Sequence, residues 1–230
     1  MISAFLHDLR KVKKMSIQNW DDLKNRQEVT REEVVEFYDS WAATYDESVE
    51  KSASADIALK AVLSQFPRKN EREKLEILDI AAGTGRVGIK LFEHGFRQID
   101  AIEPSQEMLN ILKRKDVYRN VYQTMLGGDH KATEIENDSY DLIIISGGFA
   151  KSHLPVDCLD EVIRLGRKGS IFINRMTAQN IEILEEYTHL EPYMKQLEGN
   201  GAWTQISRYL DENQTFSAGP SLTHIFRIEK

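Results

Sequence analysis

Apolar residues between positions 75 and 175 occur in short runs, and each run is followed by helical or turn sequence. The runs lie at 75–80, 98–103, about 119–125, 140–146 and 169–174. Short continuous runs that alternate with amphipathic helices are typical of parallel strands covered on both faces. The pattern therefore predicts an α/β fold: a Rossmann-like, doubly wound, mostly parallel sheet with helices on both faces.

The last part of the chain follows a different pattern. Trp203 to Leu210 and Thr223 to Ile228 alternate between apolar and polar residues, as half-buried strands do. The stretch 211–221 between them is polar, contains turn residues and shows no helical period. We therefore expect an antiparallel C-terminal hairpin that closes the sheet.

Two helical segments are predicted ahead of the sheet. Thr30 and Glu33 have the spacing of a capping box, which favours a helix that begins near Glu32. A second helix is predicted for 53–66, and Pro67 ends it. One face of the first helix is apolar and largely aromatic, with Val34, Phe37, Tyr38, Trp41 and Tyr45.

Residues 1–28 are polar and mixed in charge, and their few apolar residues form no wide helical stripe. We interpret them as a mobile N-terminal extension. Residues 29–70 are predicted to form a helical lid, and residues 71–230 the α/β core. A chain of 230 residues has room for one such domain and a small appendage, but not for a second full domain.

Charge and composition narrow the choice of partners. The formal net charge is −7 and no sustained basic stripe is present, which argues against long nucleic acid. No apolar run approaches the ~18 residues that cross a bilayer. Cys158 is the single cysteine, so neither a disulfide pair nor a cysteine-rich metal site is expected. We expect a soluble, cytoplasmic protein without a metal that acts on a small molecule or a protein.

The first strand of the core leads into a glycine-containing turn. Gly83-x-Gly85-x-x-Gly88 matches the fingerprint of dinucleotide-binding proteins, and Glu103 follows at about the 20-residue spacing of a ribose-binding acid. Small residues in such a turn let a ligand approach the backbone. The fingerprint alone leaves an NAD(P)-dependent oxidoreductase open.

Three acidic residues distinguish between the cofactors. Asp79, Glu103 and Asp129 lie at or just after the ends of the first three predicted strands. Three carboxylates around one ligand would repel a pyrophosphate but suit a sulfonium and an ammonium group. Glu103 would accept both ribose hydroxyls, and Asp129 the adenine amino group. These charges favour S-adenosylmethionine over NAD. The alternative for each of the three segments is an ordinary turn that binds no ligand.

Three segments of this chain resemble motifs of a known family. They are similar, in order, to the first three cofactor motifs of class I S-adenosylmethionine-dependent methyltransferases: Asp79-x-Ala81-x-Gly83-x-Gly85, Glu103-Pro104-Ser105 and Gly128-Asp129. The segment 37–46 resembles the helix that these enzymes fold over the methionine end of the cofactor. A narrower resemblance, to the methyltransferase-like protein of the Williams-Beuren region and its relatives, is carried by three segments: Trp41-Ala42-x-x-Tyr45-Asp46, Leu78-Asp79-Ile80-Ala81-x-Gly83-Thr84-Gly85 and Ile102-Glu103-Pro104-Ser105.

The resemblance implies S-adenosyl-L-methionine as cofactor, S-adenosyl-L-homocysteine as product, and methyl transfer to oxygen, nitrogen or sulfur of a small-molecule acceptor. The motifs and their neighbours give the expected cofactor-binding residues as Tyr38, Trp41, Tyr45, Asp79, Ala81, Gly83, Gly85, Glu103, Pro104, Met108, Gly128, Asp129, His130 and Ser146.

Two positions depart from the family pattern. Ala81 stands where many relatives have glycine. The segment 146–149, Ser-Gly-Gly-Phe, replaces the Asn/Asp-Pro-Pro-aromatic motif of many nucleic-acid and amide methyltransferases. The second departure argues against those substrates.

Methyl transfer from a sulfonium is an in-line displacement that depends on positioning and desolvation. A hydroxyl acceptor would benefit from a general base, for which His153 is the candidate, with an ordinary loop histidine as the alternative. Asn174 and Arg175 end the fifth strand, where they either line an acceptor pocket, bind a carboxylate through the planar fork of the arginine, or are edge residues. The competing functions are the oxidoreductase and a non-catalytic cofactor-binding module that acts through a protein partner.

Overall fold

The computed structural model describes residues 16–212 and 219–230. Residues 1–15 of the expected N-terminal extension lie outside the described residues. The helices and strands, with 3-10 helices marked η, are in chain order α2 (Trp20–Asn25), α3 (Arg31–Ser48), α4 (Ser54–Gln65), η1 (Lys69–Lys74), β1 (Glu76–Ile80), α5 (Arg86–Glu93), β2 (Gln98–Ile102), α6 (Gln106–Arg114), β3 (Val121–Tyr122), β4 (Tyr140–Ser146), α7 (Cys158–Leu165), β5 (Gly166–Thr177), α8 (Asn180–Ile183), η2 (Glu185–Tyr187), α9 (Leu190–Gly199), β6 (Trp203–Asp211) and β7 (Ser221–Ile228).

One sheet joins the strands of the described part in the order β3-β2-β1-β4-β5-β7-β6. β1 pairs in parallel with β2 and β4, and β4 pairs in parallel with β5. β7 runs antiparallel to both of its neighbours, β5 and β6. The predicted fold, a mostly parallel sheet closed by an antiparallel C-terminal hairpin, is confirmed.

Two strands differ in length from the sequence prediction. β3 covers only Val121–Tyr122 of the expected 119–125, and it pairs with β2 alone at the edge of the sheet. β5 is longer than the expected 169–174, since Gly166 pairs with Tyr140 of β4 and Thr177 pairs with Ser221 of β7. Pairing with β4 at its start and with the antiparallel β7 at its end therefore extends β5 beyond the apolar run that marked it in the sequence.

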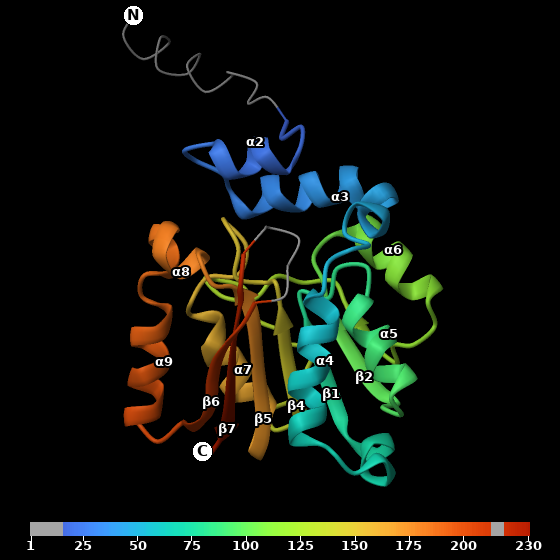
Figure 1. Cartoon of the computed structure of the whole chain (residues 1–230), viewed down its shortest axis with the longest axis vertical. Helices are drawn as coiled ribbons and strands as arrows, with labels where there is room; N and C mark the ends of the chain where they lie inside the picture. The colour runs from blue at the N-terminus through green and yellow to red at the C-terminus, as the bar shows by residue number, and fades with distance from the viewer. Residues whose placement is uncertain (1–15, 213–218) are drawn as a thin grey trace, which may run out of the picture.

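Helices cover both faces of the sheet (Figure 1). Successive residues of a strand point to opposite faces, so Ile77 packs with residues of α4 and α5, and Leu78 packs with residues of α7 and α9. A smaller cluster joins Ala101 of β2 to Leu109 and Leu112 of α6. Packing from both sides holds the carboxyl ends of the strands at one edge of the domain.

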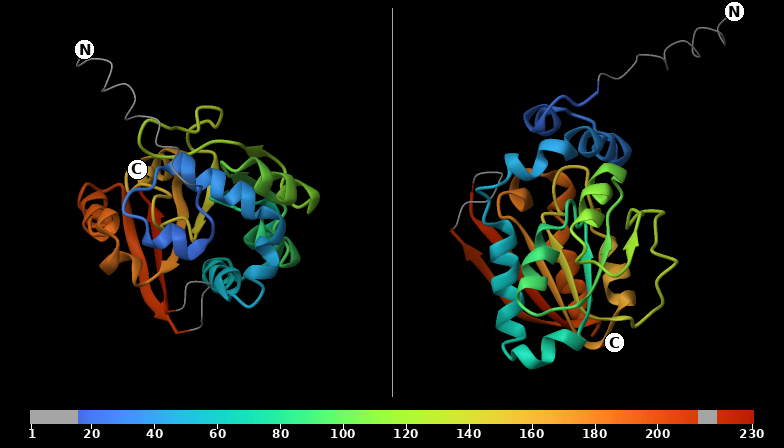
Figure 2. Two further views of the ribbon diagram at one scale, coloured as in Figure 1. Left: turned by 90° about the horizontal axis from the view of Figure 1, so that it is seen from above. Right: turned by 90° about the vertical axis from the view of Figure 1, so that its right-hand side faces the viewer.

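α2 and α3 lie across this edge of the sheet, as Figure 1 and the view from above in Figure 2 show. The capping box predicted at the start of α3 is present: Thr30 Oγ1 accepts a hydrogen bond from Glu33 N at 3.2 Å, and Glu33 Oε2 accepts one from Thr30 N at 2.8 Å. The helix predicted near Glu32 is thus confirmed, and it begins at Arg31.

The described part of the N-terminal segment packs onto the lid. Ile17 and Leu23 are buried in a cluster with Val34 and Phe37 of α3. Part of the segment 16–28 therefore packs against α3. Among the described helices, none has the length and apolar character needed to span a bilayer.

Candidate active site

A cavity lies between α3 and the carboxyl ends of β1, β2 and β4; we call it the first cavity. Thr124, Met125 and Leu126, which follow β3, form part of its wall and were not foreseen from the sequence. The residues singled out from the sequence that line it are Tyr38, Tyr45, Ala81, Gly83, Glu103, Pro104, Met108, Ser146 and His153.

The turn after β1 exposes backbone to this cavity. Gly83 has a φ of +57°, and no atom lies within 4 Å of the position that a Cβ would take, so the space beside it is open. Ala81 also has a positive φ, 56°, a conformation that costs a residue with a Cβ about 1–2 kcal/mol. Gly85, with a φ of 85°, is the N-cap of α5 and is not among the lining residues.

Glu103, just after β2, holds this turn in place. Its carboxylate accepts hydrogen bonds from the N–H of Gly83 at 2.8 Å and the N–H of Ser105 at 2.9 Å. Burial raises the pKa of Glu103 to about 7, while the two N–H groups act in the opposite direction by stabilising the ionised form. A carboxylate that ionises near neutral pH therefore lines the first cavity.

We expected Asp79 to lie at the ligand, but it is not among the residues that line the first cavity. It is 1% exposed, and its Oδ2 accepts a hydrogen bond of 2.7 Å from the hydroxyl of Tyr118. The same hydroxyl accepts a bond of 3.0 Å from Gly88 N, and a Cβ on Gly88 would lie 2.2 Å from the Tyr118 ring. Burial raises the pKa of Asp79 to about 7. Asp79 and the last glycine of the fingerprint thus accommodate Tyr118 behind the turn.

Two acidic residues of α3, for which the sequence predicted no role, tether the lid to the core. Asp39 Oδ1 accepts a hydrogen bond of 2.6 Å from the hydroxyl of Ser105, at the start of α6. Asp46 Oδ1 accepts one of 2.6 Å from the hydroxyl of Thr84, in the turn after β1. The lid helix is therefore held over two of the loops that line the first cavity.

Arg31 fixes the other end of α3. Its guanidinium donates hydrogen bonds to the carbonyl of Leu126 at 2.6 Å and the carbonyl of Gly127 at 2.9 Å. Arg31 lies at the first position of α3, so the bonds hold the segment after β3 against the lid. No pattern in the sequence pointed to this contact.

Gly128, Asp129 and His130 are exposed and do not line the first cavity. Gly128 N donates to the carboxylate of Asp157 at 3.0 Å, and a Gly127–His130 bridge closes a tight turn. The turn exposes these residues to solvent, and the adenine contact expected from Asp129 stays a prediction.

His153 contacts the lid through Tyr38. Its Nδ1 lies 2.7 Å from the carbonyl of Lys151, which can only accept, so Nδ1 carries the proton. The lone pair of Nε2 then accepts a hydrogen bond of 2.9 Å from the hydroxyl of Tyr38. Burial lowers the pKa of His153 to about 4, which keeps the ring neutral.

Trp41 supports the two tyrosines from behind. Its ring centroid lies 6.0 Å from that of Tyr38 and 4.9 Å from that of Tyr45, and it does not line the first cavity. Its indole N–H donates to the hydroxyl of Ser48 at 3.2 Å. Trp41 therefore orients the aromatic wall without forming its surface.

A second cavity adjoins the first. The two cavities share a common wall made of Tyr38, Tyr45, Ser146 and Gly147. The second cavity extends from α2 to the loop after β4, the end of β5 and α8. Its apolar and aromatic residues beyond the common wall include Trp20, Leu23, Val49, Phe149, Ile183 and Leu184.

Comparison with known proteins characterises the central part of the chain. Residues 77–169 match the family described as a methyltransferase domain. Methyltransferase-like protein 27 of Homo sapiens is 25% identical over 171 residues, which cover 73% of this chain and 66% of that protein. The chain thus spans just under two thirds of the length of this relative.

Solved structures share the fold at low sequence identity. A protein of Methanococcus maripaludis, provisionally described as an S-adenosyl-L-methionine-dependent methyltransferase, matches with a TM-score of 0.57 and 14% identity, covering 90% of this chain and 96% of that one. The [4+2]-cyclase SpnF matches with a TM-score of 0.66 and 11% identity, covering 87% of this chain and 96% of that one. These likenesses concern the fold.

Proposed function

We propose that residues 77–169, which match a methyltransferase domain, are of the class I, S-adenosylmethionine-dependent kind, and that the protein transfers a methyl group to a small-molecule acceptor. The observation that carries the proposal is the common wall between the two cavities. In-line displacement requires donor and acceptor atoms about 3–3.5 Å apart, so the two reactants need adjoining sites.

The residues of the first cavity fit the cofactor. Glu103 offers carboxylate oxygens to ribose hydroxyls, and the open space at Gly83 lets a ligand approach the backbone. Tyr38 and Tyr45 supply aromatic rings that attract a sulfonium. When bound, the cofactor supplies an electrophilic methyl group with a neutral leaving group. Trp41, Asp79 and Gly85 act behind this surface, as supports of the tyrosines and of the turn.

We assign His153 a positioning role in place of the general base. A group with a pKa of about 4 is a poor proton acceptor for a hydroxyl at neutral pH. Its Nε2 is engaged by Tyr38, and its side chain lines the first cavity rather than the second. The contribution of the chain is then to bind, orient and exclude water.

The second cavity supports a small acceptor. It lies beneath α2 and α3, and Trp20, Leu23 and Tyr38 form part of its lining. A net charge of −7 disfavours a long nucleic-acid strand across this face. The oxidoreductase alternative has less support, because residues 77–169 match a methyltransferase domain.

Calorimetric titration with S-adenosylhomocysteine, with NADH as the control, tests the cofactor. We expect micromolar or tighter binding of S-adenosylhomocysteine and no heat of binding from NADH. Binding of NADH alone would sink the proposal in favour of the oxidoreductase. If S-adenosylhomocysteine binds but no methylated product forms with any metabolite or protein acceptor offered, the non-catalytic module replaces the enzyme.

A further inference from the structure

Arg175, near the end of β5, is a buried cation that forms no ion pair with a carboxylate among residues 16–212 and 219–230. It is 3% exposed, and its Nη2 has no hydrogen-bond partner in the described part of the chain. Its Nε donates to the hydroxyl of Ser221 at 2.6 Å. No ion pair within the described ranges joins it to a carboxylate. Residues 213–218 contain no acidic residue in the sequence.

Arg72 shows how this chain satisfies a buried guanidinium that has a structural role. It is 8% exposed, and it donates to the carbonyls of Phe66, Pro67 and His94 at 2.9–3.0 Å. Arg175 has no such set of carbonyls, and burial lowers its pKa to about 10. Burial of an uncompensated charge destabilises a fold, so a partner is expected from outside the chain.

Arg175 faces the second cavity, whose charged residues are all basic. Lys24, Arg86 and Lys151 also line it, and no aspartate or glutamate does so among the described residues. The chain as a whole has more acidic than basic residues, 37 against 30, so this distribution is specific to the cavity. The remainder of the lining is largely apolar and aromatic.

The guanidinium of Arg175 lies beside the common wall of the two cavities. A Cβ on Gly147, which belongs to the common wall, would lie 3.8 Å from Arg175 Nη1. Gly147 N also donates to the carbonyl of Arg175 at 2.8 Å, which fixes the two strand ends relative to each other. Ser221 holds the guanidinium through Nε, while Nη2 is buried without a hydrogen-bond partner in the described part of the chain.

We propose that Arg175 binds the carboxylate of the methyl acceptor, and that the acceptor is a carboxylic acid with an apolar or aromatic body. The two N–H groups at the end of a guanidinium match the two oxygens of a carboxylate. This inference rests on the proposed function, because it places the acceptor in the second cavity. It goes further by naming the chemical class of the acceptor and the residue that selects it.

Matched acid and amide probes test the proposal. Phenylacetate, hexanoate and 4-hydroxybenzoate are each titrated against their primary amides on the full chain, with and without saturating S-adenosylhomocysteine. We expect at least one acid to bind tenfold or more tightly than its amide. The proposal is overturned if every acid binds no better than its amide.

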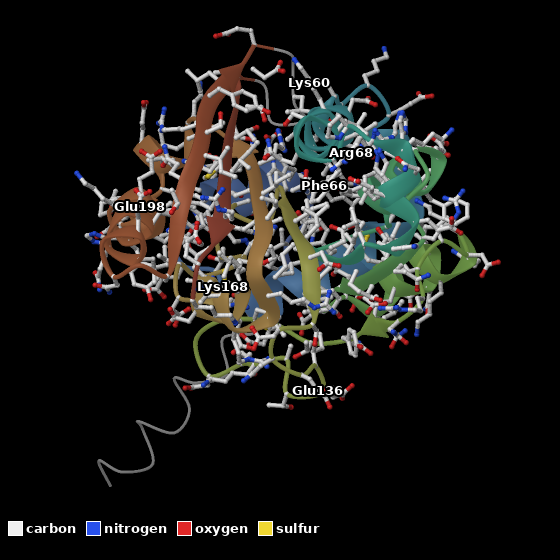
Figure 3. The ribbon with its side chains drawn as sticks, turned by 90° about the horizontal axis from the view of Figure 1, so that it is seen from below. Lys60, Phe66, Arg68, Glu136, Lys168 and Glu198 are labelled. Atoms are coloured by element: carbon white, nitrogen blue, oxygen red, sulfur yellow. The ribbon has the colours of Figure 1, made fainter. Side chains whose placement is uncertain are left out.

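Substitutions of Arg175 test whether this residue causes the preference for an acid over its amide. Arg175→Gln should abolish the preference for the acid, and Arg175→Lys, which keeps the charge but lacks the planar fork, should retain part of it. Arg167→Gln is the matched control at the opposite end of β5, where Arg167 pairs with Asp141 at 2.7 Å. Its neighbour Lys168 is labelled in Figure 3, which shows the molecule from below. A preference that persists in Arg175→Gln overturns the proposal.

The cofactor itself has a carboxylate that Arg175 could bind in place of the carboxylate of the acceptor. The same variants distinguish these two carboxylates. Arg175→Gln should keep its affinity for S-adenosylhomocysteine within about twofold. A large loss of that affinity, with the acid preference intact, would assign Arg175 to the cofactor and overturn the proposal. If S-adenosylhomocysteine does not bind the wild type at all, the proposed function fails, while the acid and amide comparison still reports on Arg175. If Arg175→Gln does not fold, the proposal is tested by the acid and amide affinities of the wild type and of Arg175→Lys.

Discussion

The hydroxyl of Tyr38 donates a hydrogen bond of 2.9 Å to Nε2 of His153 across 115 residues of sequence. The bond joins the lid helix to the loop after β4 at the wall of the first cavity. Since the opposite nitrogen of the ring is held by the carbonyl of Lys151, His153 presents an acceptor to the lid. The orientation of Tyr38 therefore depends on a histidine that stays neutral.

Removal of this bond should loosen the lid. Tyr38→Phe leaves a buried ring nitrogen without a donor, which we expect to lower the free energy of unfolding by about 1–3 kcal/mol. Urea denaturation of Tyr38→Phe, His153→Leu and the double variant measures the coupling, expected near 1 kcal/mol. Tyr45→Phe is the control, because no hydrogen bond of the Tyr45 hydroxyl is present in the described residues. Additive effects at Tyr38 and His153 would contradict the contact.

Cofactor binding should tighten with rising pH. Glu103 has a pKa of about 7 and must be ionised to accept two ribose hydroxyls. Affinity for S-adenosylhomocysteine is then expected to fall about tenfold for each pH unit below 7. Calorimetry between pH 5.5 and 8.5 measures this slope, and Glu103→Gln should bind weakly without it.

Asp79 has a similar pKa and serves as the control for that slope. Asp79→Asn should keep the pH dependence of binding, since Asp79 does not line the first cavity. If Asp79→Asn removes the slope and Glu103→Gln retains it, the roles of the two acids are reversed.

Asp79 should make the ligand-free protein less stable as pH rises. The pKa of an aspartate in the unfolded chain is 3.8 and that of Asp79 in the fold is about 7, so the native state holds an extra proton between these values. The stabilisation is complete below about pH 4 and is lost as pH rises through 7. The free energy of unfolding of Asp79→Asn should therefore be higher than that of the wild type by about 1–3 kcal/mol at pH 8. This difference should shrink towards pH 4. Chemical denaturation measures it, with the exposed Asp21→Asn as control.

Ala81→Gly should not destabilise the protein. Glycine in a strand or turn usually costs about 0.5–1 kcal/mol relative to alanine, but Ala81 has a φ of 56°. Relief of the left-handed backbone, worth about 1–2 kcal/mol, offsets that cost. We expect an unfolding free energy equal to wild type or up to about 1 kcal/mol higher. Ala82→Gly, one residue on and without a positive φ, should lose stability in the same assay.

The sequence predicted the fold well because the relevant signals are local. Continuous apolar runs marked β1, β2, β4 and β5, and a capping box marked the start of α3. The Gly83 turn and Glu103 were placed together correctly, since parallel strands bring their carboxyl ends to one edge. The length of β5 was underestimated because its last residues pair with β7, about 45 residues later in the chain.

The side-chain pairings of the site were harder to predict. Asp79 was expected at the ligand, but Tyr118 donates to it from the segment before β3. Asp129 was expected at the adenine, but its turn faces solvent. No prediction was made for the partners of Arg31 and Asp46, and only the docking of α3 shows them. Periodicity identifies the face of a helix, whereas these contacts depend on which loop that face meets.

The common wall has a kinetic consequence. Because Tyr38 and Tyr45 stand in both cavities, α3 cannot move away from one without opening the other. In the proposed reaction, the demethylated cofactor and the methylated product would then both leave when α3 opens, and the next cofactor and acceptor would enter by the same opening. We expect the rate of lid opening to limit the turnover rate, and we expect both cavities to exchange their ligands only while the lid is open.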